Sequence, residues 1–205
     1  MTAPLVNLSF PHAWDAEILP RRPAILPARR FVYPQDAEEV ERGALEVMIQ
    51  PRAVSCEGVP GAAPLASTQG FLATCAVGFL DPVAPSGIWA APNPAEICAV
   101  SGGYAYLIDT AAPPRFTMIP FRPVLEIRAL VEHGLLLFVG HHAIIAWGRA
   151  GQAWQSEKLS DEGVTLTGVE AGILNGMGWN RIADRETPFR VDLGSGGRIP
   201  DHSRP

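Results

Sequence analysis

The chain has few charged residues, few cysteines and no long apolar run, and each shortage excludes a class of protein. Charged residues make up 18% of the 205 residues, and the formal net charge is −5 at pH 7. Nucleic acids are bound through clustered lysine and arginine side chains, so this composition argues against a nucleic-acid partner. The basic pairs Arg21-Arg22 and Arg29-Arg30 are too few to change that expectation and are interpreted as a solvated segment.

Cysteine is equally scarce. The three cysteines, Cys56, Cys75 and Cys98, are odd in number and far apart, and no Cys-x-x-Cys pair occurs. A zinc cage built from cysteines is therefore not expected. Cys75 and Cys98 lie in apolar stretches, which predicts buried thiols and a reducing compartment.

Signals for secretion and for membrane insertion are missing as well. The N-terminus lacks a basic region followed by a long apolar run, so we expect no signal peptide. No run of about 18 apolar residues occurs, so we expect no transmembrane helix. These features predict a cytoplasmic protein without a membrane partner.

The sequence is rich in apolar residues that are divided by turn formers. Hydrophobic residues reach 47%, with 20 prolines and 20 glycines. Short apolar runs separated by proline and glycine are typical of an all-β fold. The stretches predicted as strands are 44–49, 71–80, 87–89, 95–100, 104–108, 116–119, 124–131, 135–139, 143–147, 152–158, 164–169, 173–174 and 189–193.

The N-terminal region differs from the rest in its proline content. Residues 1–30 hold five prolines, which exclude a long helix or a central strand and predict an extended Pro-rich segment. Residues 31–200 are predicted to form a single β domain. Within it, residues 36–41 are compatible with a short helix, and residues 51–70 resemble a loop.

Two aromatic hairpins resemble each other at a fixed offset. A spacing of 38 residues separates each of three pairs, which are Gly102 and Gly140, Asp109 and Trp147, and Phe116 and Trp154. A weaker third copy includes Gly176, Asp184 and Phe189. A period close to 40 residues built from hairpins is typical of propeller-like β repeats. It predicts repeat units at about 95–132, 133–170 and 171–200.

Three predicted repeat units are too few to close a propeller by themselves. Propeller blades have about four strands, and a closed propeller needs at least four blades. Irregular N-terminal strands, a homodimer that completes a ring, or sandwich-like antiparallel sheets would each resolve the shortage. We expect a repeat-built, propeller-like or sandwich-like arrangement, with the monomer preferred.

One block of residues resembles a group of uncharacterised, mainly bacterial proteins. It comprises Ala146-Trp147-Gly148, Gly151, Ala153-Trp154, Ser156, Asp161-Glu162-Gly163, Gly178-Trp179 and Pro188-Phe189-Arg190-Val191-Asp192-Leu193. The resemblance covers about residues 90–200 and consists mostly of turn and packing residues. It implies a β-rich fold and transfers no catalytic residue, because no activity is assigned to that group. Propeller repeats are similar in general, although residues 90–200 contain no Trp-Asp dipeptide.

Four residues are candidates for catalysis, namely His141, His142, Asp161 and Asp184. An imidazole paired with carboxylates would suit a hydrolase acting on a small molecule or a sugar. The competing interpretation treats the histidines as structural residues at the mouth of a hairpin. It treats the aspartates as turn residues that bind their own backbone. No metal-ligand spacing occurs, so neither a metal nor a cofactor is expected.

Turn and core positions explain the remaining motifs. Trp89, Trp147, Trp154 and Trp179 are predicted to pack in the core, with Trp147 and Trp154 facing each other across their hairpin. Gly194-Ser195-Gly196 lacks the strand-to-helix context of a nucleophile elbow and is interpreted as a turn. The sequence therefore favours a non-enzymatic binding or scaffolding module whose partner is a protein or a small molecule. The hydrolase stays the alternative.

Overall fold

The computed structural model describes residues 4–35, 43–52, 69–80 and 83–200, and it consists of strands. This described part holds one short 3-10 helix, η2 (Val131–His133), and no α-helix, which confirms the predicted all-β class. The possible helix at 36–41, most of the expected 51–70 loop and Cys56 lie outside the described residues. Contacts divide the chain into two compact units, Met1–Arg122 and Pro123–Pro205.

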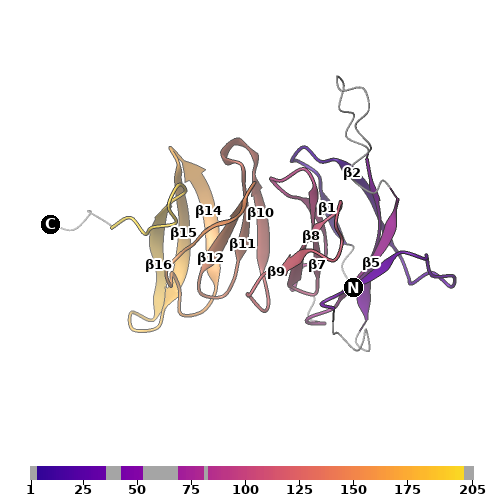
Figure 1. Ribbon diagram of the computed structural model, residues 1–205. Helices are drawn as coiled ribbons and strands as arrows, with labels where there is room; N and C mark the ends of the chain where they lie inside the picture. Colours follow the sequence, from indigo (N-terminus) through magenta and orange to yellow (C-terminus); the bar gives the residue numbers. More distant parts are fainter. Residues whose placement is uncertain (1–3, 36–42, 53–68, 81–82, 201–205) are drawn as a thin grey trace, which may run out of the picture. The chain divides into compact units, whose positions relative to one another are not determined.

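The first unit holds two sheets (Figure 1). Sheet 1 has the order β1 (Leu5–Asn7), β6 (Gly87–Ala90), β7 (Glu96–Ser101), β8 (Tyr104–Asp109), β9 (Phe116–Met118). Sheet 2 has the order β2 (Trp14–Leu19), β4 (Ala44–Pro51), β5 (Phe71–Ala76), β3 (Arg30–Tyr33). Neighbouring strands are antiparallel except for β1 with β6 and β3 with β5, which are parallel.

Two strands lie within residues 1–30, where we expected an extended segment. β1 is the outermost strand of sheet 1, and β2 is the outermost strand of sheet 2. Edge positions tolerate prolines nearby because one side of the strand donates no ladder hydrogen bonds. The connection from β2 to β3 contains Pro20, Pro23 and Pro27 and joins the two opposite edges of sheet 2.

Three buried aromatic side chains connect sheet 1 to sheet 2 through hydrogen bonds of their polar atoms. Trp14 of β2 is fully buried, and its Nε1–H donates to the carbonyl of Glu96 at 3.1 Å. The Tyr106 hydroxyl donates to the carbonyl of Ala76 at 3.0 Å, and the Tyr33 hydroxyl donates to that of Pro113 at 2.8 Å. Each ring is buried while its polar atom stays bonded, as a packed interior requires.

Cys75 of β5 and Cys98 of β7 are fully buried free thiols, as predicted. Burial raises the pKa of both thiols far above the usual value. Thiols held in the neutral form are poor nucleophiles and poor metal ligands. These two cysteines therefore contribute to packing in the first unit.

Strand β4 carries a buried carboxylate, Glu46, that contacts the connection following β2. The Glu46 side chain is 5% exposed and accepts hydrogen bonds from the Thr74 hydroxyl at 2.7 Å and from Arg22 Nε at 3.1 Å. Arg30 Nε donates to the same Thr74 oxygen at 3.3 Å. Because Arg22 belongs to the β2–β3 connection, this group of bonds holds that connection against sheet 2.

Removal of the Glu46 carboxylate should therefore cost more stability than removal of a surface carboxylate. We expect Glu46→Ala to lower the free energy of unfolding by about 1–2 kcal/mol, because Thr74 loses a buried acceptor. Asp15→Ala is the matched control. Its pair with Arg52 has both side chains more than half exposed, so solvent screens it and we expect almost no change. Urea denaturation measures both variants, and equal losses would contradict the structural role of Glu46.

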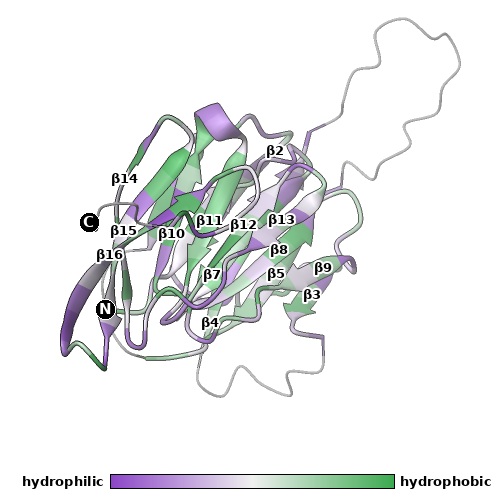
Figure 2. Ribbon diagram, turned by 90° about the vertical axis from the view of Figure 1, so that its left-hand side faces the viewer, coloured by the Kyte–Doolittle hydropathy of each residue, from purple (hydrophilic) through white to green (hydrophobic). Residues whose placement is uncertain are grey.

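The second unit also holds two sheets (Figure 1). Sheet 3 is an antiparallel meander of β10 (Glu126–Leu130), β11 (Leu135–Val139), β12 (Ile144–Gly148) and β13 (Gly151–Gln155). Sheet 4 is an antiparallel meander of β14 (Val164–Glu170), β15 (Ile173–Asn180) and β16 (Arg185–Asp192). Figure 2 shows the hydrophobic colouring along β11 and β12.

One hydrophobic cluster joins sheet 3 to sheet 4. Its members alternate along the strands, so each sheet gives one face to the cluster. They are Leu135, Leu137, Val139, Ile144, Ala146, Trp154, Leu159, Val164, Leu166, Leu174, Phe189, Val191 and Leu193. The core of the second unit therefore lies between its two sheets.

The β12–β13 hairpin differs from the prediction in its register. Trp154 lies opposite Ala146, and Trp147 lies opposite Gln152, because a β-bulge shifts the pairing between Ala146 and Trp147. The expected facing of the two tryptophans across the hairpin was wrong. Both indoles are nevertheless buried, with exposures of 6% and 7%, which confirms their interpretation as core residues.

The two hairpins with the 38-residue offset occupy corresponding places. Strands β8 and β9 end sheet 1, and strands β12 and β13 end sheet 3. Gly102 and Gly140 both lie in the turn before the first strand of their hairpin, whereas Gly176 lies inside β15. The third stretch therefore differs from the other two at its first glycine.

Candidate functional site

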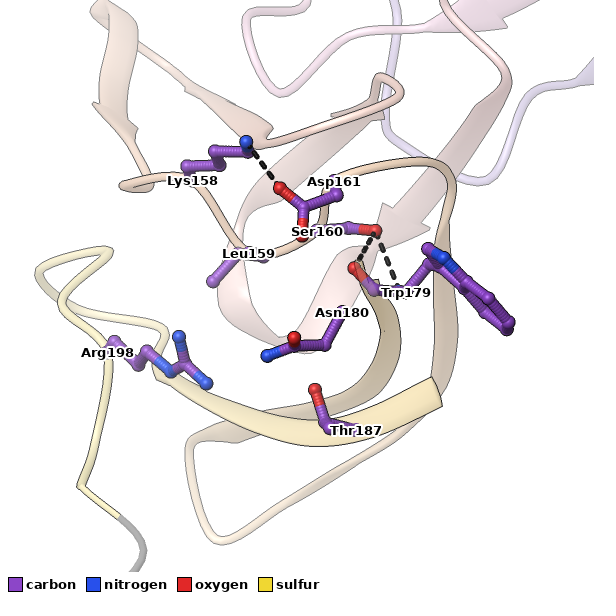
Figure 3. A pocket seen from close by; sticks show the side chains of 8 residues that line it. All are labelled: Lys158, Leu159, Ser160, Asp161, Trp179, Asn180, Thr187 and Arg198. Carbon is purple, nitrogen blue, oxygen red and sulfur yellow. Dashed lines mark hydrogen bonds and ion pairs between the residues drawn. The ribbon is translucent and has the colours of Figure 1, made fainter. Parts of the chain in front are cut away.

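A polar pocket of about 130 Å³ lies in the second unit, beside the end of β15 (Figure 3). The loop that follows β13 supplies one side, and the β15–β16 hairpin and the segment after β16 supply the other. The lining residues are Lys158, Leu159, Ser160, Asp161, Trp179, Asn180, Thr187 and Arg198.

Ser160 connects the loop that follows β13 to strand β15 through hydrogen bonds. Its hydroxyl accepts the N–H groups of Trp179 at 2.8 Å and Glu162 at 3.1 Å, and it donates to the carbonyl of Trp179 at 3.3 Å. A hydroxyl has one hydrogen and two lone pairs, so these three bonds use its whole capacity. Ser160 is therefore a structural bridge between loop and strand, and its oxygen is not available as a nucleophile.

Gly178 allows the loop to pass directly over the strand. A Cβ atom at this position would lie 2.4 Å from the carbonyl oxygen of Leu159 and 3.0 Å from Cβ of Ser160. Only a glycine leaves room for that approach.

Asp161 is a lining residue with both carboxylate oxygens engaged. One oxygen accepts from Lys158 Nζ at 2.6 Å, and the other accepts from the backbone N–H of Arg181 at 2.8 Å. The hydrogen bond from Lys158, followed by that from Arg181, lowers the pKa of Asp161 below its usual value. Asp161 is thus an ionised partner of Lys158 at neutral pH and a poor general base.

Asn180 is oriented by the turn that it begins. Its Oδ1 accepts the N–H groups of Ile182 at 3.0 Å and Ala183 at 2.9 Å. This turn geometry fixes which side of the amide is the acceptor, so the Nδ2 donor faces the pocket, as Figure 3 shows. The Thr187 hydroxyl, which also lines the pocket, donates to the carbonyl of Gly178 at 3.3 Å.

Arg198 is the lining residue with the most unused capacity for hydrogen bonds. Its backbone forms an isolated β-bridge with Val191 of β16, and its side chain reaches toward Asn180 and Thr187 (Figure 3). Among the residues that the structure describes, the guanidinium has no hydrogen bond or ion pair. Arg198 is exposed, and its up to five N–H donors have no acceptor among the described residues.

The four predicted catalytic residues do not gather in this pocket. Asp161 lines it, whereas His141, His142 and Asp184 do not. Asp184 lies exposed in the β15–β16 turn with φ +48°, which confirms its interpretation as a turn residue.

The two histidines form the exposed turn between β11 and β12, with ring centroids 6.1 Å apart. Both histidines precede β12, which begins at Ile144. His142 Nδ1 lies 3.2 Å from the carbonyl oxygen of Ser160, and the His142 carbonyl accepts the N–H of Leu159 at 2.7 Å. His142 therefore contacts the backbone of the loop that follows β13, at Leu159 and Ser160.

No group of three or more histidine, cysteine, aspartate or glutamate side chains is placed to hold a metal ion within the described ranges. In those ranges no helix has the length and apolar character needed to cross a membrane.

Sequence reasoning missed Lys158, Asn180, Thr187 and Arg198. Asn180 carries a recognisable signal, because an asparagine at the end of a strand often begins a turn. Arg198 carries none, since it follows a glycine-rich loop and reaches the pocket only through its pairing with Val191. Comparison with protein families, curated proteins and solved structures gives no match. The chemistry of the site is therefore derived from its own geometry.

Proposed function

We propose that the chain is a non-enzymatic binding module whose polar pocket in the second unit receives a small polar ligand. One observation carries this proposal. The hydroxyl of Ser160 has its hydrogen-bonding capacity filled by the fold, and Asp161 is paired with Lys158, while Asn180 and Arg198 hold unused donors beside the same pocket. Unused donors beside satisfied reactive groups favour recognition over bond cleavage.

The hydrolase alternative gains no support from the contacts. A hydrolytic site needs a base within hydrogen-bond reach of a nucleophile, and a third group that orients the base. In the described part of the chain no hydrogen bond or ion pair joins His141 or His142 to a carboxylate. His142 instead contacts the backbone of Ser160.

The size of the pocket restricts the ligand. About 130 Å³ is less than the roughly 300–1,000 Å³ of typical sites for drug-sized molecules. It is close to the cavity of about 150 Å³ that accommodates a benzene ring in an engineered protein. The pocket therefore suits a group of a few non-hydrogen atoms, either alone or as the end of a larger ligand.

We also propose that the sheets are propeller-type blades. The support comes from the meander order of sheet 3, the run β6-β7-β8-β9 in sheet 1, and the 38-residue offset between their last hairpins. Membership of the uncharacterised bacterial group and a cytoplasmic location stay predictions.

Two-dimensional NMR of ¹⁵N-labelled protein tests the binding proposal. We expect inorganic phosphate, acetate, glycerol or acetamide to shift the amide signals of Asp161, Trp179 and Asn180, which line the pocket, and to leave β10 unchanged. Thr187→Leu fills the pocket and should abolish the shifts. Thr167→Leu, at an exposed position of β14, is the matched control and should retain them. Shifts that persist in Thr187→Leu, or that spread over the whole second unit, would contradict the proposal.

A further inference from the structure

On the basis of the proposed function, we infer that the group entering the pocket is an anion, a carboxylate or a phosphate, and that Arg198 holds it. The inference names a ligand class and an anchoring residue for a site defined so far only as polar. It follows from the charges, donors and backbone supports of the described residues around the pocket.

The charges of the lining residues leave one cation uncompensated. Lys158 and Asp161 form an ion pair at 2.6 Å, so their charges offset each other. Arg198 has no such partner in the described chain, and it lies in a protein whose net charge is −5. A lone positive charge at the edge of a pocket attracts an anion from solution, although the net negative charge of the protein opposes that attraction.

The hydrogen-bonding groups show the same preference. Arg198 is a donor only, and the Nδ2 of Asn180 adds further donors beside it. A carboxylate or phosphate oxygen accepts from both groups at once, and the planar guanidinium matches either anion with two parallel bonds. A bound cation would have to share Asp161 with Lys158, whose positive charge already offsets that carboxylate.

The backbone around Arg198 is held in place before any ligand binds. The N–H of Ile199 donates to the carbonyl of Arg190 at 2.8 Å, and the carbonyl of Gly197 accepts the N–H of Asp192 at 2.9 Å. These two bonds on either side of Arg198 attach the segment to β16 and its end. A pre-positioned cation loses less conformational entropy on binding than one on a free tail.

The glycine-rich loop before Arg198 is fixed by Trp154. A Cβ atom on Gly196 would lie 2.7 Å from the Trp154 ring, and the Trp154 Nε1–H donates to the carbonyl of Leu193 at 2.7 Å. Because Trp154 belongs to the core of the second unit, the loop and the arginine that follows it are connected to that core.

NMR titration of the full chain with single small probes tests the inference. We expect inorganic phosphate and acetate to bind with dissociation constants on the order of millimolar, as suits ligands of a few atoms. Glycerol and acetamide should bind at least about tenfold more weakly, because they offer no charge to the guanidinium. Added sodium chloride should weaken the binding of both anions. The ratio of the two anion affinities tells whether the site prefers a phosphate or a carboxylate.

Variants of Arg198 separate charge from shape. Arg198→Gln removes the charge at similar length and should weaken anion binding at least about tenfold, while Arg198→Lys should retain part of it without the two parallel bonds. Arg149→Ala, an exposed arginine in the β12–β13 turn, should bind as the wild type does. Circular dichroism verifies that the variants are folded.

Two outcomes would overturn the inference, and they differ in what else they affect. If glycerol or acetamide shifts the pocket amides as strongly as the anions do, or if Arg198→Gln binds anions unchanged, the anion assignment fails while the binding module stands. If none of the four probes shifts the pocket amides, the assignment and the proposed function both fail.

Discussion

Replacement of Trp14 by alanine is expected to lower the free energy of unfolding of the first unit by about 4 kcal/mol. The indole is fully buried, and its truncation leaves a large cavity where β2 meets the start of β7. The variant also leaves the carbonyl of Glu96 without its donor. Urea denaturation followed by circular dichroism measures the loss.

Two further variants isolate the source of that loss. Trp14→Phe keeps most of the buried ring but removes the Nε1–H donor, so we expect a smaller loss of about 1–2 kcal/mol. Phe79→Ala removes an aromatic ring that is 40% exposed in the same unit, and it should cost less than Trp14→Ala. A Trp14→Ala variant as stable as Phe79→Ala would show that the indole does not hold the two sheets together.

Replacement of Gly176 by alanine is expected to destabilise the second unit by about 3 kcal/mol. Gly176 of β15 lies opposite Phe189 of β16, and the phenyl ring covers the glycine. An added Cβ would lie 2.2 Å from the ring and 2.6 Å from the carbonyl oxygen of Thr165. Neither neighbour is free to yield, because the ring lies in the core and the carbonyl belongs to β14.

A matched glycine and a double variant test this explanation. Gly168 lies in β14 with no atom within 4 Å of a built Cβ, so Gly168→Ala should change stability by less than about 0.5 kcal/mol. Phe189→Leu should make Gly176→Ala less costly, with a coupling of about 1 kcal/mol or more, because the nearest clash is removed. Strict additivity of the two substitutions would show that the ring does not restrict this position.

Apolar runs with clear boundaries predicted the strands in the middle of the chain. Residues 135–139 were predicted as a strand and form β11 with the same ends, because an uninterrupted Leu-Leu-Leu-Phe-Val run is flanked by glycines. β15 was expected only at 173–174 but extends to Asn180. Its glycines conceal the strand in the sequence, yet Gly176 and Gly178 are there because Phe189 and Leu159 approach too closely for any side chain.

Prolines also concealed strands in the sequence, at β16 and within residues 1–30. β16 was expected from Phe189 and begins at Arg185, because Pro188 is tolerated in a strand at the edge of sheet 4. The prolines of residues 1–30 likewise concealed β1 and β2, both of which are edge strands. Local composition does not show whether a strand lies at an edge or in the centre, so these strands could not be predicted from it.

The candidate site was predictable only in part. Asp161 was among the four candidates because a carboxylate can pair with an imidazole in a hydrolytic site. Arg198 and Asn180 contribute the donors that define the pocket, and they come together through pairing between distant segments. Conversely, the adjacent pair His141 and His142 suggested a catalytic imidazole, but both residues lie in an exposed turn outside the pocket.

The first strand of the chain has a consequence for how the protein is made. β1 pairs with β6, and the Trp14 indole bonds to Glu96, a residue 82 positions later. During synthesis these N-terminal segments leave the ribosome well before their partners exist. Leu5 and Val6 are more than half exposed even in the finished fold. We expect the first unit to assemble late and slowly, since contacts between distant residues carry a large loop-closure cost. Until β6 and β7 follow, the side chains of β1 and β2 lack the strands that they contact in the folded unit.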